Sequence, residues 1–112
     1  MMNGLNLLKI IEEMRKFDSH MESQTIAVFF YVCLYGGADG VSMQTISEKL
    51  DLAQSTVSRN CYKLGDKTRD GIGIGLLQSF EDPMERRRKL VRLTGKGKRV
   101  YQTLSDLVVG TS

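Results

Sequence analysis

Apolar positions in the middle of the chain recur at helical spacing in two neighbouring stretches. Ile46 and Leu50 are four residues apart, and Val57, Cys61 and Leu64 then repeat at intervals of four and three residues. Such spacing places each set on one face of a helix. Because both faces need a core to cover them, the pattern predicts two short helices that pack on each other.

The segment between these two helices has the length of a tight turn. Residues 51–53 read Asp-Leu-Ala, and Ser47 supplies a small side chain where the second helix must cross closely over the first. We therefore predict a helix-turn-helix over residues 42–67, with its second helix over 54–66. Ser42 is the expected N-cap of the first helix.

Two further helical segments precede this pair. The first is amphipathic and is predicted over residues 7–21. The second, over 24–35, is apolar almost all round; its β-branched and aromatic content would also suit a strand, but its length and the Gly36-Gly37 pair that follows favour a buried central helix. The apolar positions of the first helix are Leu7, Ile10, Ile11, Met14, Phe17 and Met21.

A β-hairpin is predicted over residues 76–93, where apolar positions are followed by turn residues and a second apolar run. Its strands are expected at 76–81 and 88–93, on either side of a turn at 82–85. Residues 41–44 are expected to add a short strand beside it. A hairpin that follows a helix-turn-helix in this way is a wing.

The segment at 67–75, KTRDGIGIG, separates the second helix from this wing. Its three glycines at alternate positions predict a mobile connector without helix or strand. A Gly-rich phosphate loop is the alternative, but no Gly-Lys-Ser/Thr follows, so the nucleotide-binding motif is absent. The connector can still bring Lys67 and Arg69 onto a DNA backbone.

The chain closes with a helix over 95–108, for which Thr94 is the expected N-cap. Together these elements predict a mainly α chain with a small β-hairpin, an α+β winged helix-turn-helix that forms a single domain over residues 1–112. A chain of 112 residues is long enough for one core and too short for two. The apolar face of the last helix carries Val100, Tyr101, Leu104 and Leu107 or Val108.

Charge divides the chain into two unlike parts. Residues 1–51 carry 4 basic and 7 acidic side chains, whereas residues 52–112 carry 12 and 6, so the net charges are −3 and +6. A basic run alone is usually a solvated face, but beside a helix-turn-helix it favours a polyanionic partner. Half of the 16 basic residues fall within fourteen positions: Arg86, Arg87, Arg88, Lys89, Arg92, Lys96, Lys98 and Arg99.

The second helix of the pair carries polar groups on the side opposite its apolar stripe. Amide, hydroxyl, guanidinium and phenol groups there can read base edges in a major groove or hold phosphates. An ordinary solvated surface on a helical hairpin is the alternative, and the neighbouring wing favours DNA. The predicted DNA-binding residues are Gln54, Ser55, Thr56, Ser58, Arg59, Tyr62 and Lys63 on this helix and Arg86, Arg87, Arg88 and Lys89 on the wing.

The order of elements, and above all DPMERRRKLVRLTGKGKRV in the wing, resembles the MarR family of bacterial transcription regulators. Leu93, Thr94 and Gly97 match the Leu-Thr-x-x-Gly with which the family opens its last helix. The resemblance implies that Arg87 is a wing-tip arginine in the minor groove and that Glu85 orients it. It covers roughly residues 7–108, and it is specific in the wing and generic in the helix-turn-helix.

The resemblance also implies a homodimer, because members of the family dimerise by interleaving their first and last helices. Both end helices are short in this chain, so the expected interface is reduced, and the alternative is that the two helices pack only on each other. A small-molecule effector site, which many members build beside the dimer interface, is left open. Too little helix is expected to wall off such a pocket.

No constellation of catalytic or metal-binding residues is visible. His20 is the lone histidine and is expected on a solvated helix end, so little is available for general base work near neutral pH. Cys33 and Cys61 fall on apolar helix faces, which favours small hydrophobes over a metal pair, a disulfide or a redox sensor. We therefore expect no enzyme activity, no cofactor and no metal.

The sequence thus predicts a sequence-specific regulator of transcription that binds double-stranded DNA and represses by occupancy. A winged-helix module that binds another protein, such as an anti-repressor or assembly factor, is the competing class. A replication or recombination accessory protein shares all the same residues. No run of eighteen apolar residues and no secretory signal occurs, so a cytoplasmic protein away from the membrane is expected.

Overall fold

The computed structural model describes residues 3–68 and 71–109. This part of the chain forms helices and a small three-stranded antiparallel sheet of order β1-β5-β4, which confirms the predicted α+β winged helix-turn-helix. A separate pair of very short strands, β2 and β3, follows the fourth helix. The elements in chain order are α1 (Gly4–Arg15), α2 (Ser23–Tyr35), β1 (Val41–Ser42), α3 (Met43–Leu50), α4 (Gln54–Lys63), β2 (Lys67–Thr68), β3 (Gly71–Ile72), β4 (Leu77–Glu81), β5 (Lys89–Leu93) and α5 (Gly95–Val109).

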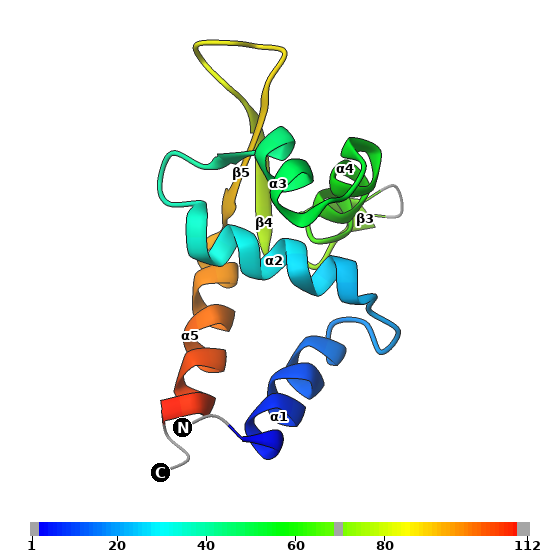
Figure 1. Cartoon of the computed structure of the whole chain (residues 1–112), viewed down its shortest axis with the longest axis vertical. Coiled ribbons are helices and arrows are strands. Elements are labelled where there is room, and N and C mark those ends of the chain that lie inside the picture. The colour runs from blue at the N-terminus through cyan, green and yellow to red at the C-terminus, as the bar shows by residue number, and fades with distance from the viewer. Residues whose placement is uncertain (1–2, 69–70, 110–112) are drawn as a thin grey trace.

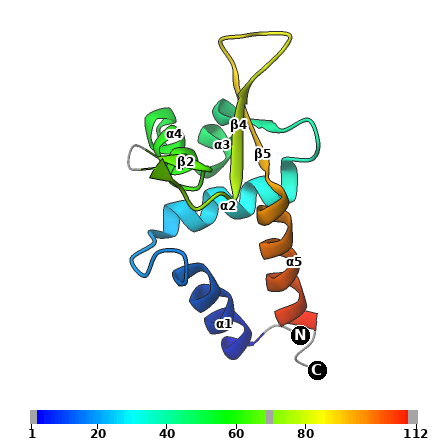
Figure 2. The ribbon, with the colours of Figure 1, turned by 180° about the vertical axis from the view of Figure 1, so that it is seen from behind.

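Helix α2 lies at the centre of the molecule, as its apolar sequence predicted. The helix-turn-helix and the sheet lie on one side of it, whereas α1 and α5 extend from the other side, away from the wing (Figures 1 and 2). No helix within the described ranges is long and apolar enough to span a bilayer. The buried apolar side chains come from every layer: Met14, Val28, Phe29, Val32, Ile46, Val57, Cys61, Leu64, Leu76, Leu77, Val91 and Leu104.

The helix-turn-helix forms where the apolar spacing predicted it. The Ser42 hydroxyl caps α3 by accepting the Thr45 amide at 3.0 Å, and Asp51 ends that helix in a left-handed conformation with φ 53°. Helix α4 ends at Lys63 and is therefore shorter than the predicted 54–66. The carbonyl of the next residue, Leu64, accepts the amides of residues 76 and 77, which directs the chain into the wing.

The first helix differs from the predicted 7–21 at both ends. It starts at Gly4 because Asn3 accepts the amide of the third helical residue in a capping box, and it ends at Arg15. Phe17 and Met21 nevertheless pack against the core from the turn that follows. Helical spacing of apolar residues therefore continued past the end of the helix.

The prediction that residues 67–75 form no strand was wrong. Strands β2 and β3 pair antiparallel, and Gly71 accommodates a φ of 124° beside the tip of this small hairpin. The far end of the segment is fixed to the start of α5, since the Thr94 hydroxyl donates to the Gly75 carbonyl at 2.6 Å. The predicted backbone contact of Arg69 lies outside the described residues.

The wing is a regular hairpin with a longer tip than predicted. Strands β4 and β5 pair from Leu77 opposite Leu93 to Glu81 opposite Lys89, and β1 pairs with β5 as expected. The Asp82 amide donates to the Arg88 carbonyl at 2.9 Å and closes the loop. Arg88 therefore belongs to the tip, whereas the sequence placed it in the second strand.

A close backbone contact joins the wing to α5. The Leu76 carbonyl accepts the Thr94 amide at 3.0 Å, and a Cβ atom on Gly97 would lie 2.1 Å from the same oxygen. Only glycine fits at that position without a shift of the backbone. The Thr94 hydroxyl also accepts the Gly97 amide at 3.0 Å, which confirms the predicted N-cap.

Candidate nucleic-acid interface

Helix α4 presents the predicted polar face to solvent. Gln54, Ser55, Ser58 and Arg59 are exposed, and Thr56 is half-buried. The opposite face is buried among the core side chains, because α4 packs on both α2 and α3. The helix is therefore held by one face and leaves a row of hydrogen-bonding groups free.

These groups meet the wing across an open groove of about 760 Å³. One wall is formed by α3 and α4, and the other is formed by the tip of the wing and the first residue of β5. Seven of the residues predicted to bind DNA or orient the wing lie together here. They are Gln54, Ser55 and Ser58 from α4 and Glu85, Arg87, Arg88 and Lys89 from the wing.

The start of α3, which was not among the predicted site residues, also lines the groove. Gln44, Thr45 and Glu48 face the wing, and the Gln44 amide nitrogen donates to a Glu48 carboxylate oxygen at 3.3 Å. Gln44 and Glu48 are four residues apart on the polar side of α3. That spacing, opposite Ile46 and Leu50, was the signal in the sequence that could have revealed them.

The wing tip is fully accessible. Residues 84–89 are all exposed, and Met84 is 92% exposed. The Asp82 carboxylate accepts the Met84 amide at 2.9 Å, so the turn is fixed by its own hydrogen bonds. Among the described residues no ion pair joins Glu85 to Arg87, although both line the groove.

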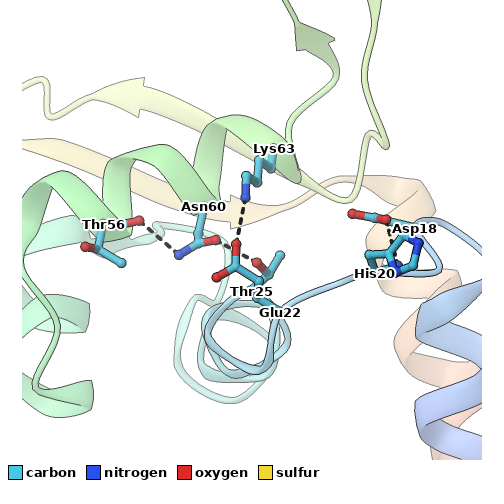
Figure 3. A network of polar contacts seen from close by, with 7 residues as sticks. All are labelled: Asp18, His20, Glu22, Thr25, Thr56, Asn60 and Lys63. Carbon is cyan, nitrogen blue, oxygen red and sulfur yellow. Dashed lines mark hydrogen bonds and ion pairs between the residues drawn. The ribbon is translucent and has the colours of Figure 1, made fainter.

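Five residues predicted to bind DNA do not line this groove. Arg59 and Arg86 are exposed but are not among its lining residues, and the other three make contacts of their own. Lys63 pairs with Glu22 at 3.2 Å, on the side of α4 that faces α2 (Figure 3). Tyr62 lines a second cavity, of about 400 Å³, between α4 and the wing strands. Thr56 contributes its carbonyl, which accepts the Asn60 side-chain amide at 3.0 Å. Three wing cations and three residues from the first half of α4 thus line the groove.

A third hollow, an apolar groove of about 420 Å³, lies between α1, α2 and α5. We expected too little helix to line a pocket at this end of the molecule, yet three helices contribute to it. The Asn6 side-chain amide donates to the Leu107 carbonyl at 2.9 Å and ties α1 to α5 within the chain. Leu7 and Ile11 line the groove and remain 53% and 40% exposed.

Both cysteine thiols are held in their protonated form. Burial raises the pKa of Cys33 and that of Cys61 from 9.0 to about 12. The thiolate, which is the nucleophile and the metal ligand, is therefore scarce at neutral pH. Within residues 3–68 and 71–109 no three His, Cys, Asp or Glu side chains gather as a metal site.

The paired helices, the hairpin and the cationic groove between them define a winged helix-turn-helix protein, a class built to place a helix in the major groove of DNA. No protein-family model matches the chain, and no curated protein sequence matches it. Solved structures do match. They identify the branch of this class whose fold the chain shares.

The PcaV transcriptional regulator from Streptomyces coelicolor, solved with its natural ligand, is 25% identical with a TM-score of 0.63, over 95% of this chain and 68% of PcaV. The MepR–DNA complex from S. aureus is 19% identical with a TM-score of 0.72, over 92% and 75%. A MarR-family regulator from Rhodococcus sp. RHA1 is 20% identical with a TM-score of 0.65, over 96% and 67%. The chain has the fold of the MarR-family transcriptional regulators, which confirms the resemblance seen in its wing.

Proposed function

We propose that the protein is a transcriptional regulator that binds double-stranded DNA by sequence, with α4 in the major groove and the wing in the adjacent minor groove or on the backbone. The convergence of the polar face of α4 with Arg87, Arg88 and Lys89 around one groove carries this proposal. Helix side chains supply base contacts, and the wing cations neutralise phosphates. The MepR neighbour, whose structure is a complex with DNA, supports a DNA-binding role for this fold.

The proposed regulator acts by occupancy, as a repressor, and performs no catalytic step. Binding to a promoter excludes other proteins from the same duplex, so no chemistry beyond recognition is needed. The buried, protonated thiols and the single exposed histidine are consistent with a binding protein. We also propose a cytoplasmic location, where the duplex DNA that the protein is proposed to bind is accessible.

A homodimer is the proposed binding unit. Helix α1 exposes Leu5, Leu7, Leu8 and Ile11, each between 40% and 57% accessible, at the end of the molecule away from the wing. A two-fold dimer through this end would present two copies of α4 to one duplex, so the target should be pseudo-palindromic with half-sites about one helical turn apart. The apolar groove beside it is where an effector would bind, as PcaV was solved with its natural ligand.

Glu85 is proposed to orient Arg87 when DNA is bound. Both side chains line the groove, and both are exposed and free to approach each other. Glu85→Ala should then weaken DNA binding although it removes a negative charge near the phosphates. Tighter binding by this variant would mean that Glu85 only repels DNA.

Selection of bound sites from random duplex DNA tests the proposed function directly. A regulator should enrich a pseudo-palindromic site, and its affinity for that site should fall steeply with salt. Sedimentation at micromolar concentration shows whether the free protein is a dimer. Recovery of no preferred sequence, together with salt-insensitive binding to a protein, would replace this proposal with the interaction-module alternative.

A further inference from the structure

The interface between α2 and α4 contains two polar pairs one helical turn apart. The Thr25 hydroxyl donates to the Asn60 side-chain oxygen at 2.6 Å, and the Lys63 ammonium lies 3.2 Å from the Glu22 carboxylate. Figure 3 shows both pairs bridging the same two helices. Asn60 and Lys63 are three residues apart on one face of α4, whereas Thr25 lies in the first turn of α2 and Glu22 is the N-cap residue of that helix.

The inner pair is fully enclosed. Thr25 is 3% exposed and Asn60 is 1% exposed, and the Asn60 amide nitrogen donates to the Thr56 carbonyl at 3.0 Å. No side-chain nitrogen or oxygen buried within the described residues lacks a hydrogen-bond partner. A buried amide or hydroxyl that loses its partner is costly, because water cannot replace the lost bond.

The rest of this part of the core is apolar. Val28, Phe29, Val57 and Cys61 are buried in it, and contacts between such side chains have no strong directional preference. A shift of α4 by one turn, or a rotation about its axis, would exchange one apolar contact for another. The same movement would separate the Thr25 hydroxyl from the Asn60 side-chain oxygen, although the Asn60 amide nitrogen would keep its bond to Thr56 within α4.

We propose that the Thr25–Asn60 pair is a positioning device that fixes the rotation and register of α4 on α2 and thereby aims Ser55, Ser58 and Arg59. The exposed Glu22–Lys63 pair supports it one turn further along and contributes little energy of its own. Neither Thr25 nor Asn60 touches DNA in the proposed complex. The consequence for DNA rests on the proposed function, whereas the placement of α4 does not.

Three variants separate positioning from stability. Thr25→Val removes the hydroxyl at nearly constant shape and leaves the Asn60 oxygen unpaired. The double variant Thr25→Val/Asn60→Leu replaces both partners with apolar groups. If the unpaired buried group alone lowers the stability of Thr25→Val, the double variant should regain that stability. Thr25→Ser keeps the hydroxyl. Thr103→Val is the control for loss of a threonine hydroxyl. Thr103 is exposed on α5, and its hydroxyl donates to the Arg99 carbonyl.

The first measurement is discrimination, taken as the ratio of affinities for the selected site and for random duplex. Thr25→Val and the double variant should lose about tenfold or more, the value of one misaligned base contact, while Thr25→Ser and the control keep the parent ratio. Urea unfolding should show the double variant at least as stable as Thr25→Val. A double variant that discriminates like the parent would reduce the pair to a stabilising contact and overturn the proposal.

The second measurement needs no DNA. Residual dipolar couplings of backbone amides report the orientation of α4 relative to α2 in the free protein. They should fit one orientation in the parent and a changed or averaged one in the double variant; an unchanged orientation would overturn the proposal. If the parent shows no duplex preference while the couplings change as expected, the proposed function fails and the positioning role stands.

Discussion

The cations that line the wing side of the groove should account for a measurable share of the salt dependence of DNA binding. Arg87, Arg88 and Lys89 are exposed, and within residues 3–68 and 71–109 the one ion pair that involves them joins Lys89 to Glu81 at 3.7 Å. Each cation that neutralises a phosphate adds about 0.9 to the slope of log affinity against log salt. Replacing all three with alanine should therefore lower the slope by about 2.7 for each wing on the DNA.

The effect is large enough to measure by titration at two salt concentrations. Between about 50 and 200 mM salt, one phosphate contact changes affinity by about 3.5-fold, so three contacts change it by about 40-fold. Fluorescence anisotropy with a duplex that carries one half-site gives this ratio for the parent and the triple variant. Arg87→Ala alone should weaken binding more than Arg88→Ala or Lys89→Ala, because Arg87 occupies the wing-tip position implied by the family resemblance.

Lys9→Ala supplies a control for the loss of one positive charge, to be compared with each single wing variant. Lys9 is exposed on α1, on the far side of α2 from the wing, and its removal should leave the slope unchanged. Equal slopes for the parent and the triple variant would refute the assignment of the wing to the DNA backbone. If Lys9→Ala lowered the slope as much as a single wing variant does, the effect would instead be one of net charge in general.

Three other outcomes are expected. Arg59→Ala should lower affinity for the selected site by about 1 to 3 kcal/mol in the same anisotropy assay and relax preference at one base pair; equal losses on random DNA would limit Arg59 to phosphate contact. Gly97→Ala should lower the free energy of unfolding in urea by about 2 kcal/mol, because its Cβ would lie 2.1 Å from the Leu76 carbonyl oxygen. Gly95→Ala, with its nearest neighbour at 3.5 Å, should be nearly neutral, and similar losses at both sites would rule out the close contact. Cys61 should react with iodoacetamide at pH 8 at least about 100-fold more slowly in the folded protein than in urea, since its raised pKa keeps the thiol protonated; equal rates in the two states would contradict this.

The repeated apolar spacing made the helix-turn-helix and the wing predictable from the sequence. Ile46, Val57 and Cys61 are fully or almost fully buried, as their periodicity indicated, and the Leu-Thr-x-x-Gly motif opens α5 where the family resemblance placed it. The same rule failed in α1. Phe17 keeps a helical interval from Met14 and still packs on the core, but it does so from a turn.

Polar residues that act through packing were harder to predict. Asn60 lies on the buried stripe of α4 and was not identified from the sequence, because its partner Thr25 is 35 residues away in the chain. Local periodicity contains no information about such distant pairs. Periodicity could have placed Glu48 on the polar side of α3, but only the folded wing brings cations opposite it.

The glycine of the Leu-Thr-x-x-Gly motif serves the architecture of the wing. Gly97 leaves room for the Leu76 carbonyl. The Thr94 amide donates to that carbonyl and the Thr94 hydroxyl donates to the Gly75 carbonyl, so the motif fastens the hairpin to α5. None of these contacts involves the groove. A chain that kept this joint and lost every wing arginine would still display the signature by which the family is recognised. The motif is thus a marker of shape, and the evidence for an operator must come from the residues that surround the groove.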